Sequence, residues 1–262
     1  MMFYILHDSI FNPKGLFKQV KRNGWFTSFY ILVMAIFMSL GMYNLYLSYD
    51  NPTFTEDSTG CDIVDNKFVC NGDNYNVNTM YDIYGVQIFF LNEDMTVDNI
   101  SNIGDSSIVL QGKDISLYRS RNLIVSEQIL SSKYGDFNSI TDVTDFITHL
   151  LFISGIISNT LMNLVLILTI ILISTMMFYR YRNNISYKNR FKLVTFALTP
   201  TALLITFYNL LNFDPIIFFV LAFFAYRPLF SLTRELNIQL VLREMEKNSS
   251  DNDLVDKEDK EE

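Results

Sequence analysis

The chain has 262 residues, of which 50% are hydrophobic, and a formal net charge of −8. This length would fit one globular domain, but the apolar residues come in long uninterrupted runs, which argues against an ordinary soluble protein. The net charge is a sum over segments that we expect on opposite sides of a membrane, so it cannot be used to identify a partner.

Residues 1–24 form two short amphipathic pieces separated at Pro13. The second piece is basic on one face, where it carries Lys18, Lys21 and Arg22. Such a segment can lie in the headgroup plane of a membrane and be held by anionic lipid. A plain basic flank of the first span is an equally favoured interpretation. Both make the lipid bilayer the first expected partner.

Three uncharged runs are long enough to cross a membrane. Each exceeds the roughly 20 residues that a helix needs to cross about 30 Å of hydrocarbon; they cover residues 25–47, 150–179 and 193–213. A fourth run begins at Pro215 and is interrupted by Arg227. It spans only if it continues through Pro228 to about Thr233, with Arg227 reaching the interface. A re-entrant hairpin is the alternative.

The basic residues predict the orientation. They gather before the first run and between the second and third, and a spanning fourth run (215–233) puts the basic residues that follow it on the same side. These residues are Lys14, Lys18, Lys21, Arg22, Arg180, Arg182, Lys188, Arg190, Lys192, Arg234, Arg243 and Lys247. We therefore predict a four-span α-helical bundle in the plasma membrane, with both termini in the cytoplasm.

The block between the first two spans predicts an extracytoplasmic domain. Residues 48–147 hold 16 Asp and Glu against 5 Lys and Arg. Short strand-like runs, separated by turn residues, favour a small β-rich α+β domain built on a meander, with a tight turn at 71–73. These runs lie near 68–70, 85–91, 107–110, 115–118 and 123–126. A helix that starts near Thr141, capped by Thr141 or Asp142, should cover the sheet and continue into the second span.

Both cysteines of the chain, Cys61 and Cys70, fall in this block. An oxidising compartment favours a disulfide between them, which would stabilise the domain by about 2.5 kcal/mol. Two free thiols are the alternative.

The predicted spans contain few polar groups. Asn159 and Asn163 are one turn apart, and we expect them to hydrogen-bond across a helix interface. Pro200 should kink the third span, with a neighbouring helix or a threonine hydroxyl meeting the carbonyl that it frees. A substrate cavity at this kink is the alternative. We expect Cys61, Cys70, Asn159, Asn163 and Pro200 to be the residues that matter most structurally.

No motif for chemistry stands out. His149 shares a helical face with Asp142 and Asp145, a spacing that metal sites use, but a surface patch is the favoured interpretation. No phosphate loop, nucleophile elbow or zinc motif occurs. We therefore expect no catalytic residue, no cofactor, no metal, no nucleic-acid partner and no enzymatic activity. A small-molecule ligand cannot be named.

The C-terminal segment, residues 234–262, should lie in the cytoplasm. Residues 232–245 alternate apolar and charged side chains and predict a short amphipathic helix. Residues 246–262 are charged and nearly free of apolar residues, which predicts a disordered tail.

The layout resembles a bacterial family of multispanning membrane proteins of unknown function that includes the maltodextrin-utilisation accessory protein. The segments FNPKGLFKQVKRNGW, before the first span, and VQIFFLNEDMTVDNISNIGDSSIVLQGKDISLY, outside, carry the resemblance. The cysteine pair and the acidic tail depart from the family pattern. Membership would imply a plasma-membrane protein of a low-GC Gram-positive-type bacterium, accessory to sugar uptake, and it transfers no site residue.

These features together favour a non-enzymatic accessory or sensory membrane protein with a membrane-protein partner. A minor subunit or component of a transporter is the alternative, and a membrane-embedded enzyme comes third.

Overall fold

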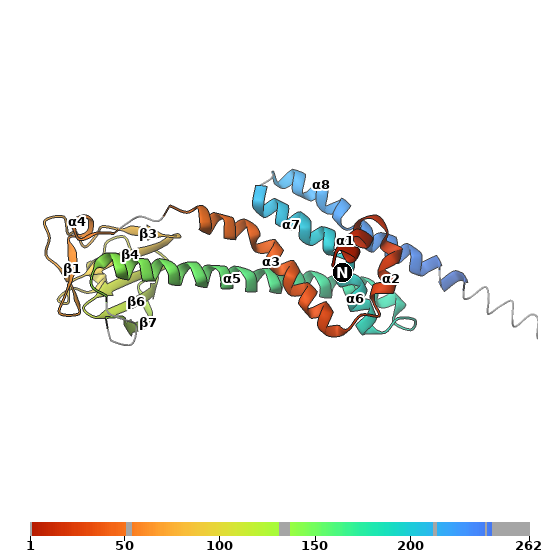
Figure 1. The fold of residues 1–262 in the computed structure, drawn as a ribbon, viewed down its shortest axis with the longest axis horizontal. Helices are drawn as coiled ribbons and strands as arrows, with labels where there is room; N and C mark the ends of the chain where they lie inside the picture. Colours follow the sequence, from red (N-terminus) through yellow and green to blue (C-terminus); the bar gives the residue numbers. More distant parts are fainter. Residues whose placement is uncertain (1, 51–53, 131–136, 212–213, 239, 243–262) are drawn as a thin grey trace, which may run out of the picture. The chain divides into compact units, whose positions relative to one another are not determined.

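The computed structural model describes residues 2–50, 54–130, 137–211, 214–238 and 240–242 (Figure 1). The chain divides into two compact units. One, here called the helical unit, comprises Met1–Asn44 and Ile157–Glu262; the other, the sheet unit, is Leu45–Ile156. Helices α3 and α5 each contribute residues to both units.

Four helices are long and apolar enough to span a membrane, as the sequence predicted. They are α3 (Gly24–Ser48), α5 (Ile140–Met177), a third helix over Tyr187–Leu211 that comprises α6 (Tyr187–Ala197) and α7 (Thr199–Leu211), and a fourth over Pro215–Leu242 that begins with α8 (Pro215–Ala225).

The fourth helix differs from the sequence prediction at its C-terminal end. We predicted a span that stops near Thr233 and a separate amphipathic helix over 232–245, but the described residues form one helix as far as Leu242 with a break at Tyr226. Pro228 lies two residues after that break, in the first turn of the second part, where a missing N–H costs no hydrogen bond. The tail predicted at 246–262 lies outside the described residues.

The N-terminal segment packs into the helical unit. It consists of α1 (Met2–Phe11), the 3-10 turn η1 (Pro13–Gly15) and α2 (Leu16–Gln19). Ile5 and Leu16 are fully buried in the same core as Met38 and Phe196. Apolar side chains of this segment are therefore buried against the other helices of the unit.

The sheet unit contains a hairpin and a five-stranded sheet. The hairpin pairs β1 (Cys61–Val64) with β2 (Lys67–Cys70) and follows the short helix α4 (Glu56–Thr59). The sheet has the order β3-β4-β5-β6-β7, with β3 Tyr81–Ile83, β4 Val86–Leu91, β5 Ser107–Gln111, β6 Asp114–Arg119 and β7 Asn122–Gln128.

The predicted meander is wrong at one connection. Strands β4 and β5 are parallel, while the other neighbours are antiparallel. A parallel pair needs a crossover rather than a tight turn, and residues 92–106, with the 3-10 turn η2 (Val97–Asn99), supply it.

The hairpin turn also lies elsewhere than predicted. Strands β1 and β2 are joined by Asp65 and Asn66, which both have positive φ, at 51° and 57°. Asn and Asp tolerate this left-handed conformation better than other residues with a Cβ. The predicted turn is present but closes no hairpin: the Gly72 carbonyl accepts from the Tyr75 N–H at 2.9 Å, and the Gly72 N–H donates to the Gly60 carbonyl at 2.9 Å.

Both faces of the central strands are buried. Ile88 and Phe90 of β4 share a core with Val143 and Ile147 of α5, so the predicted covering helix is present. The alternate residue Phe89 packs on the opposite face with Ile100 of the crossover. A strand buried on both faces has apolar residues at consecutive positions, which explains the unbroken apolar run at the end of β4.

Helix α5 begins slightly earlier than predicted. The Ser139 hydroxyl accepts from the Asp142 backbone N–H at 3.2 Å, and the Asp142 carboxylate accepts from the Ser139 N–H at 3.0 Å. This reciprocal arrangement is a capping box. Ser139 therefore caps the helix, and Asp142 is its partner rather than the cap.

Candidate functional site

The two cysteines form a disulfide. Cys61 and Cys70 face each other across the β1–β2 hairpin, and both side chains are buried. The side chain of Asn92, at the end of β4, accepts from the Cys70 N–H at 2.9 Å and donates to the Cys70 carbonyl at 2.8 Å. The amide thus attaches the hairpin to the sheet, a role that no pattern in the sequence indicated.

A group of aromatic rings lies at the beginning of the sheet unit, which starts at Leu45. The rings of Tyr46 and Tyr49 contact Tyr84, at centroid distances of 5.0 and 4.8 Å. Tyr84 has a φ of 54°, a costly conformation for an aromatic residue. Tyr49 also donates to the Asp82 carboxylate at 2.7 Å, and this hydrogen bond raises the pKa of the Tyr49 phenol.

The last strand of the sheet exposes apolar side chains. All seven residues of β7 are exposed, and Leu123, Ile124 and Val125 are each more than half exposed. Strand β7 pairs with β6 on one side and ends the strand order. An edge strand of this kind is a template for pairing with a further extended segment.

The predicted asparagine pair lies between two helices of the helical unit. Asn163 donates to the Ser39 hydroxyl of α3 at 2.9 Å, and Asn159 donates to the Ser39 carbonyl at 3.5 Å. The Ser39 hydroxyl in turn donates to the Ala35 carbonyl at 2.9 Å. The polar groups of α3 and α5 therefore bond to one another across the interface.

The break in the third helix occurs at Leu198, two residues before Pro200. The Thr199 hydroxyl donates at 2.7 Å to the Phe196 carbonyl, which a proline at 200 leaves without an i+4 donor. Because that bond uses the hydroxyl proton of Thr199, the Tyr30 hydroxyl is the donor in its 2.7 Å bond to Thr199. A threonine and a neighbouring helix thus both take part at the kink.

A pocket of about 340 Å³ lies at this kink. We call it the kink pocket. Among the described residues that line it, only Tyr30 and Thr199 carry hydroxyl groups, and these bond to each other. The remaining lining residues are apolar: Met2, Phe3, Leu6, Val33, Met34, Phe37, Ala202 and Leu203. Such a pocket suits hydrocarbon better than a polar solute.

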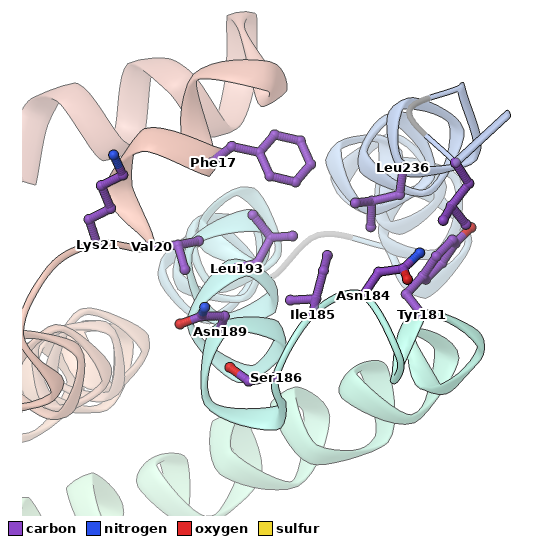
Figure 2. A pocket seen from close by; sticks show the side chains of 11 residues that line it. Phe17, Val20, Lys21, Tyr181, Asn184, Ile185, Ser186, Asn189, Leu193 and Leu236 are labelled. Carbon is purple, nitrogen blue, oxygen red and sulfur yellow. The ribbon is translucent and has the colours of Figure 1, made fainter. Parts of the chain in front are cut away.

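A larger pocket, of about 400 Å³, lies where α2, the 178–186 loop, α6 and the fourth helix meet. We call it the loop pocket; Figure 2 shows side chains from all four segments around it. Its apolar side chains are Phe17, Val20, Ile185, Leu193, Leu236 and Leu240, and its polar side chains are Lys21, Tyr181, Asn184, Ser186 and Asn189.

Three side chains make polar contacts that hold together the segments forming this pocket. The buried ammonium of Lys192, on α6, donates to the carbonyls of Val20 and Arg22. The Tyr181 hydroxyl donates to the Asn237 side chain at 2.8 Å. Lys14 forms a 2.8 Å ion pair with Glu235 of the fourth helix. The sequence marked several of these residues only as basic flanks, because their partners are distant in the chain.

Among the residues that the structure describes, no three His, Cys, Asp or Glu side chains are close enough to hold a metal ion. His149 lies on α5, as the predicted helical face requires.

Comparisons of the chain with protein-family models, curated proteins and solved structures found no match. The loop pocket, the kink pocket and the β7 edge are therefore interpreted from their own geometry.

Proposed function

We propose that this chain is a non-enzymatic accessory or sensory protein of the plasma membrane. Its four long helices would anchor it, with both termini in the cytoplasm, and its sheet unit would recognise a partner outside the cell. The basic residues before α3 and between α5 and α6 support this orientation, because such residues are retained on the cytoplasmic side.

The observation that carries the proposal is how the helices use their polar side chains. Asn163 bonds to Ser39, Tyr30 bonds to Thr199, and Asn209 of α7 donates to the Met38 carbonyl of α3 at 2.8 Å. Groups that line a transport path need to face a solute, whereas these bond between helices. Hydrogen bonds between the helices favour a membrane anchor. Recognition of a partner then falls to the sheet unit.

We further propose that the partner is a membrane or envelope protein that contributes an extended segment to β7. Backbone pairing at a sheet edge provides affinity, and apolar side chains such as Ile124 provide contact area. The family resemblance would place such a partner in sugar uptake.

Gentle extraction from the native membrane tests the proposal. The wild-type protein should migrate in native electrophoresis with a discrete larger complex. Ile124→Lys should release it, because the charge would have to be buried at the pairing edge. Val64→Lys is the matched control, since Val64 is also an exposed strand residue but lies in the β1–β2 hairpin. A wild-type protein that stays alone through extraction and mild cross-linking would refute the accessory role.

The orientation has its own test. A cysteine introduced at Lys188, in the first turn of α6, should react with a membrane-impermeant maleimide only after the membrane is opened. Labelling of intact cells would overturn the proposed topology.

A component of a transporter is the second candidate, and the kink pocket favours it for an apolar solute. In that case Thr199→Val should reduce solute uptake by cells or proteoliposomes. For an anchor, the same change should affect only stability.

A further inference from the structure

We propose that the loop pocket binds one anionic glycerophospholipid. The phosphate would lie at Lys21, and the upper part of one acyl chain would lie between Phe17, Leu193 and Leu236. The pocket volume of about 400 Å³ falls within the range of ligand-binding pockets.

The apolar wall suits hydrocarbon. Phe17 of α2, Leu193 of α6 and Leu236 of the fourth helix converge from three separate elements (Figure 2). Leu193 and Leu236 are buried in the core of the helical unit, so this wall is fixed by packing. An acyl chain placed there removes apolar surface from water.

The polar side suits a phosphate. Lys21 lies at one edge of the pocket (Figure 2). Lys14 and Lys192 have partners, whereas the Lys21 ammonium forms no ion pair or hydrogen bond with any residue of the described ranges. Asn184, Ser186 and Asn189 supply donors elsewhere in the pocket, and none of the described residues that line it is a carboxylate. Charge-assisted hydrogen bonds to a phosphate would therefore meet no opposing charge.

The pocket also lies at the right level for a lipid headgroup. The 178–186 loop joins the end of α5 to the beginning of α6, and α2 directly precedes α3. If these helices span a membrane, their shared end lies at its surface. Assignment to the anionic inner leaflet rests on the proposed orientation, but binding itself can be measured without a membrane.

Native mass spectrometry of the full-length protein, purified in delipidating detergent, tests the proposal. Dioleoyl phosphatidylglycerol should bind with one-to-one stoichiometry, and dioleoyl phosphatidylcholine should bind more weakly. Lys21→Gln should weaken binding of phosphatidylglycerol about five-fold, the effect expected for one basic residue. Lys18→Gln is the matched control: it removes the same charge three residues earlier, from α2, at a side chain that is exposed like that of Lys21 but does not line the pocket.

A second variant tests the pocket without a change of charge. Asn189 is exposed, so Asn189→Trp should fold while its indole fills the entrance and prevents one-to-one binding. Inorganic phosphate at millimolar concentration should not displace the lipid, because the acyl chain contributes to binding.

Four results would overturn the proposal. They are equal binding of the two lipids, equal losses in Lys21→Gln and Lys18→Gln, displacement by inorganic phosphate, and lipid binding that occurs only after residues 243–262 are deleted. The last would assign the pocket to the acidic C-terminal segment. None of them bears on the partner of β7, so the two proposals fail independently.

Discussion

Gly41 allows α3 and α7 to approach closely, and its replacement by alanine tests how the helical unit packs. A Cβ at position 41 would lie 2.3 Å from the Asn209 carbonyl oxygen, whereas ordinary contact begins at 3.4 Å. The obstructing atoms belong to the backbone, so the helices must separate by about 1 Å. That movement also stretches the 2.8 Å hydrogen bond from Asn209 to the Met38 carbonyl.

The expected cost follows from these two effects. Overpacking of a well-packed interior costs about 1–3 kcal/mol, and a hydrogen bond between membrane helices contributes about 0.6 kcal/mol on average. We therefore expect Gly41→Ala to lower the free energy of unfolding by about 1–3 kcal/mol. Reversible unfolding in mixed micelles of detergent and sodium dodecyl sulfate measures it.

Gly24→Ala is the control on the same helix. A Cβ at Gly24 would meet no atom within 4 Å, so this variant should be neutral or slightly stabilised, because alanine is the better helix former. If the two variants unfold at the same detergent fraction, α3 and α7 do not pack as described.

Three further predictions concern other contacts. Replacing Cys61 and Cys70 with alanine should destabilise the sheet unit by about 2.5 kcal/mol, as measured by pulse proteolysis. Reduced wild-type protein should be destabilised to a similar extent. A variant as stable as the oxidised wild type would contradict the loop-closure argument. Lys192→Met should free the carbonyls of Val20 and Arg22, which follow α2. Hydrogen exchange over residues 2–20 should then accelerate, and unchanged exchange would show that this lysine does not hold the segment. Burial raises the pKa of Tyr81 above its ordinary 10.0; the stability that this provides is complete below pH 10 and is lost as the pH rises through the raised pKa. The difference between the 295 nm titrations of wild type and Tyr81→Phe should accordingly have a midpoint above 10, and a midpoint at or below 10 would contradict the burial.

The helices were predictable because their signal is local. A run of apolar residues long enough to span a bilayer can be found without knowing what it packs against. The kink at Pro200 was predictable for the same reason, since proline lacks an N–H wherever it lies. Asn163 was recognisable as a candidate interface residue, but its partner Ser39 lies 124 positions away.

Other features were not predictable from local patterns. The parallel pairing of β4 and β5 depends on a crossover whose residues look like an ordinary loop. The turn predicted at 71–73 is present, but the hairpin itself turns at Asp65 and Asn66, because the strand that pairs with β2 precedes it in the chain. Both misassignments arose because strand pairing joins segments that periodicity cannot relate.

The sequence by itself determined that this chain has three membrane-length apolar runs, an acidic segment between the first two, and a cysteine pair within that segment, and it favoured a fourth span over a re-entrant hairpin. These are properties of composition and spacing along the chain. Only the tertiary structure decided that Phe17, Lys21, Leu193 and Leu236 surround one pocket, because they come from segments whose shared surroundings are created by packing. The pocket is a property of side chains that meet across long sequence distances, and no periodicity in the chain encodes it.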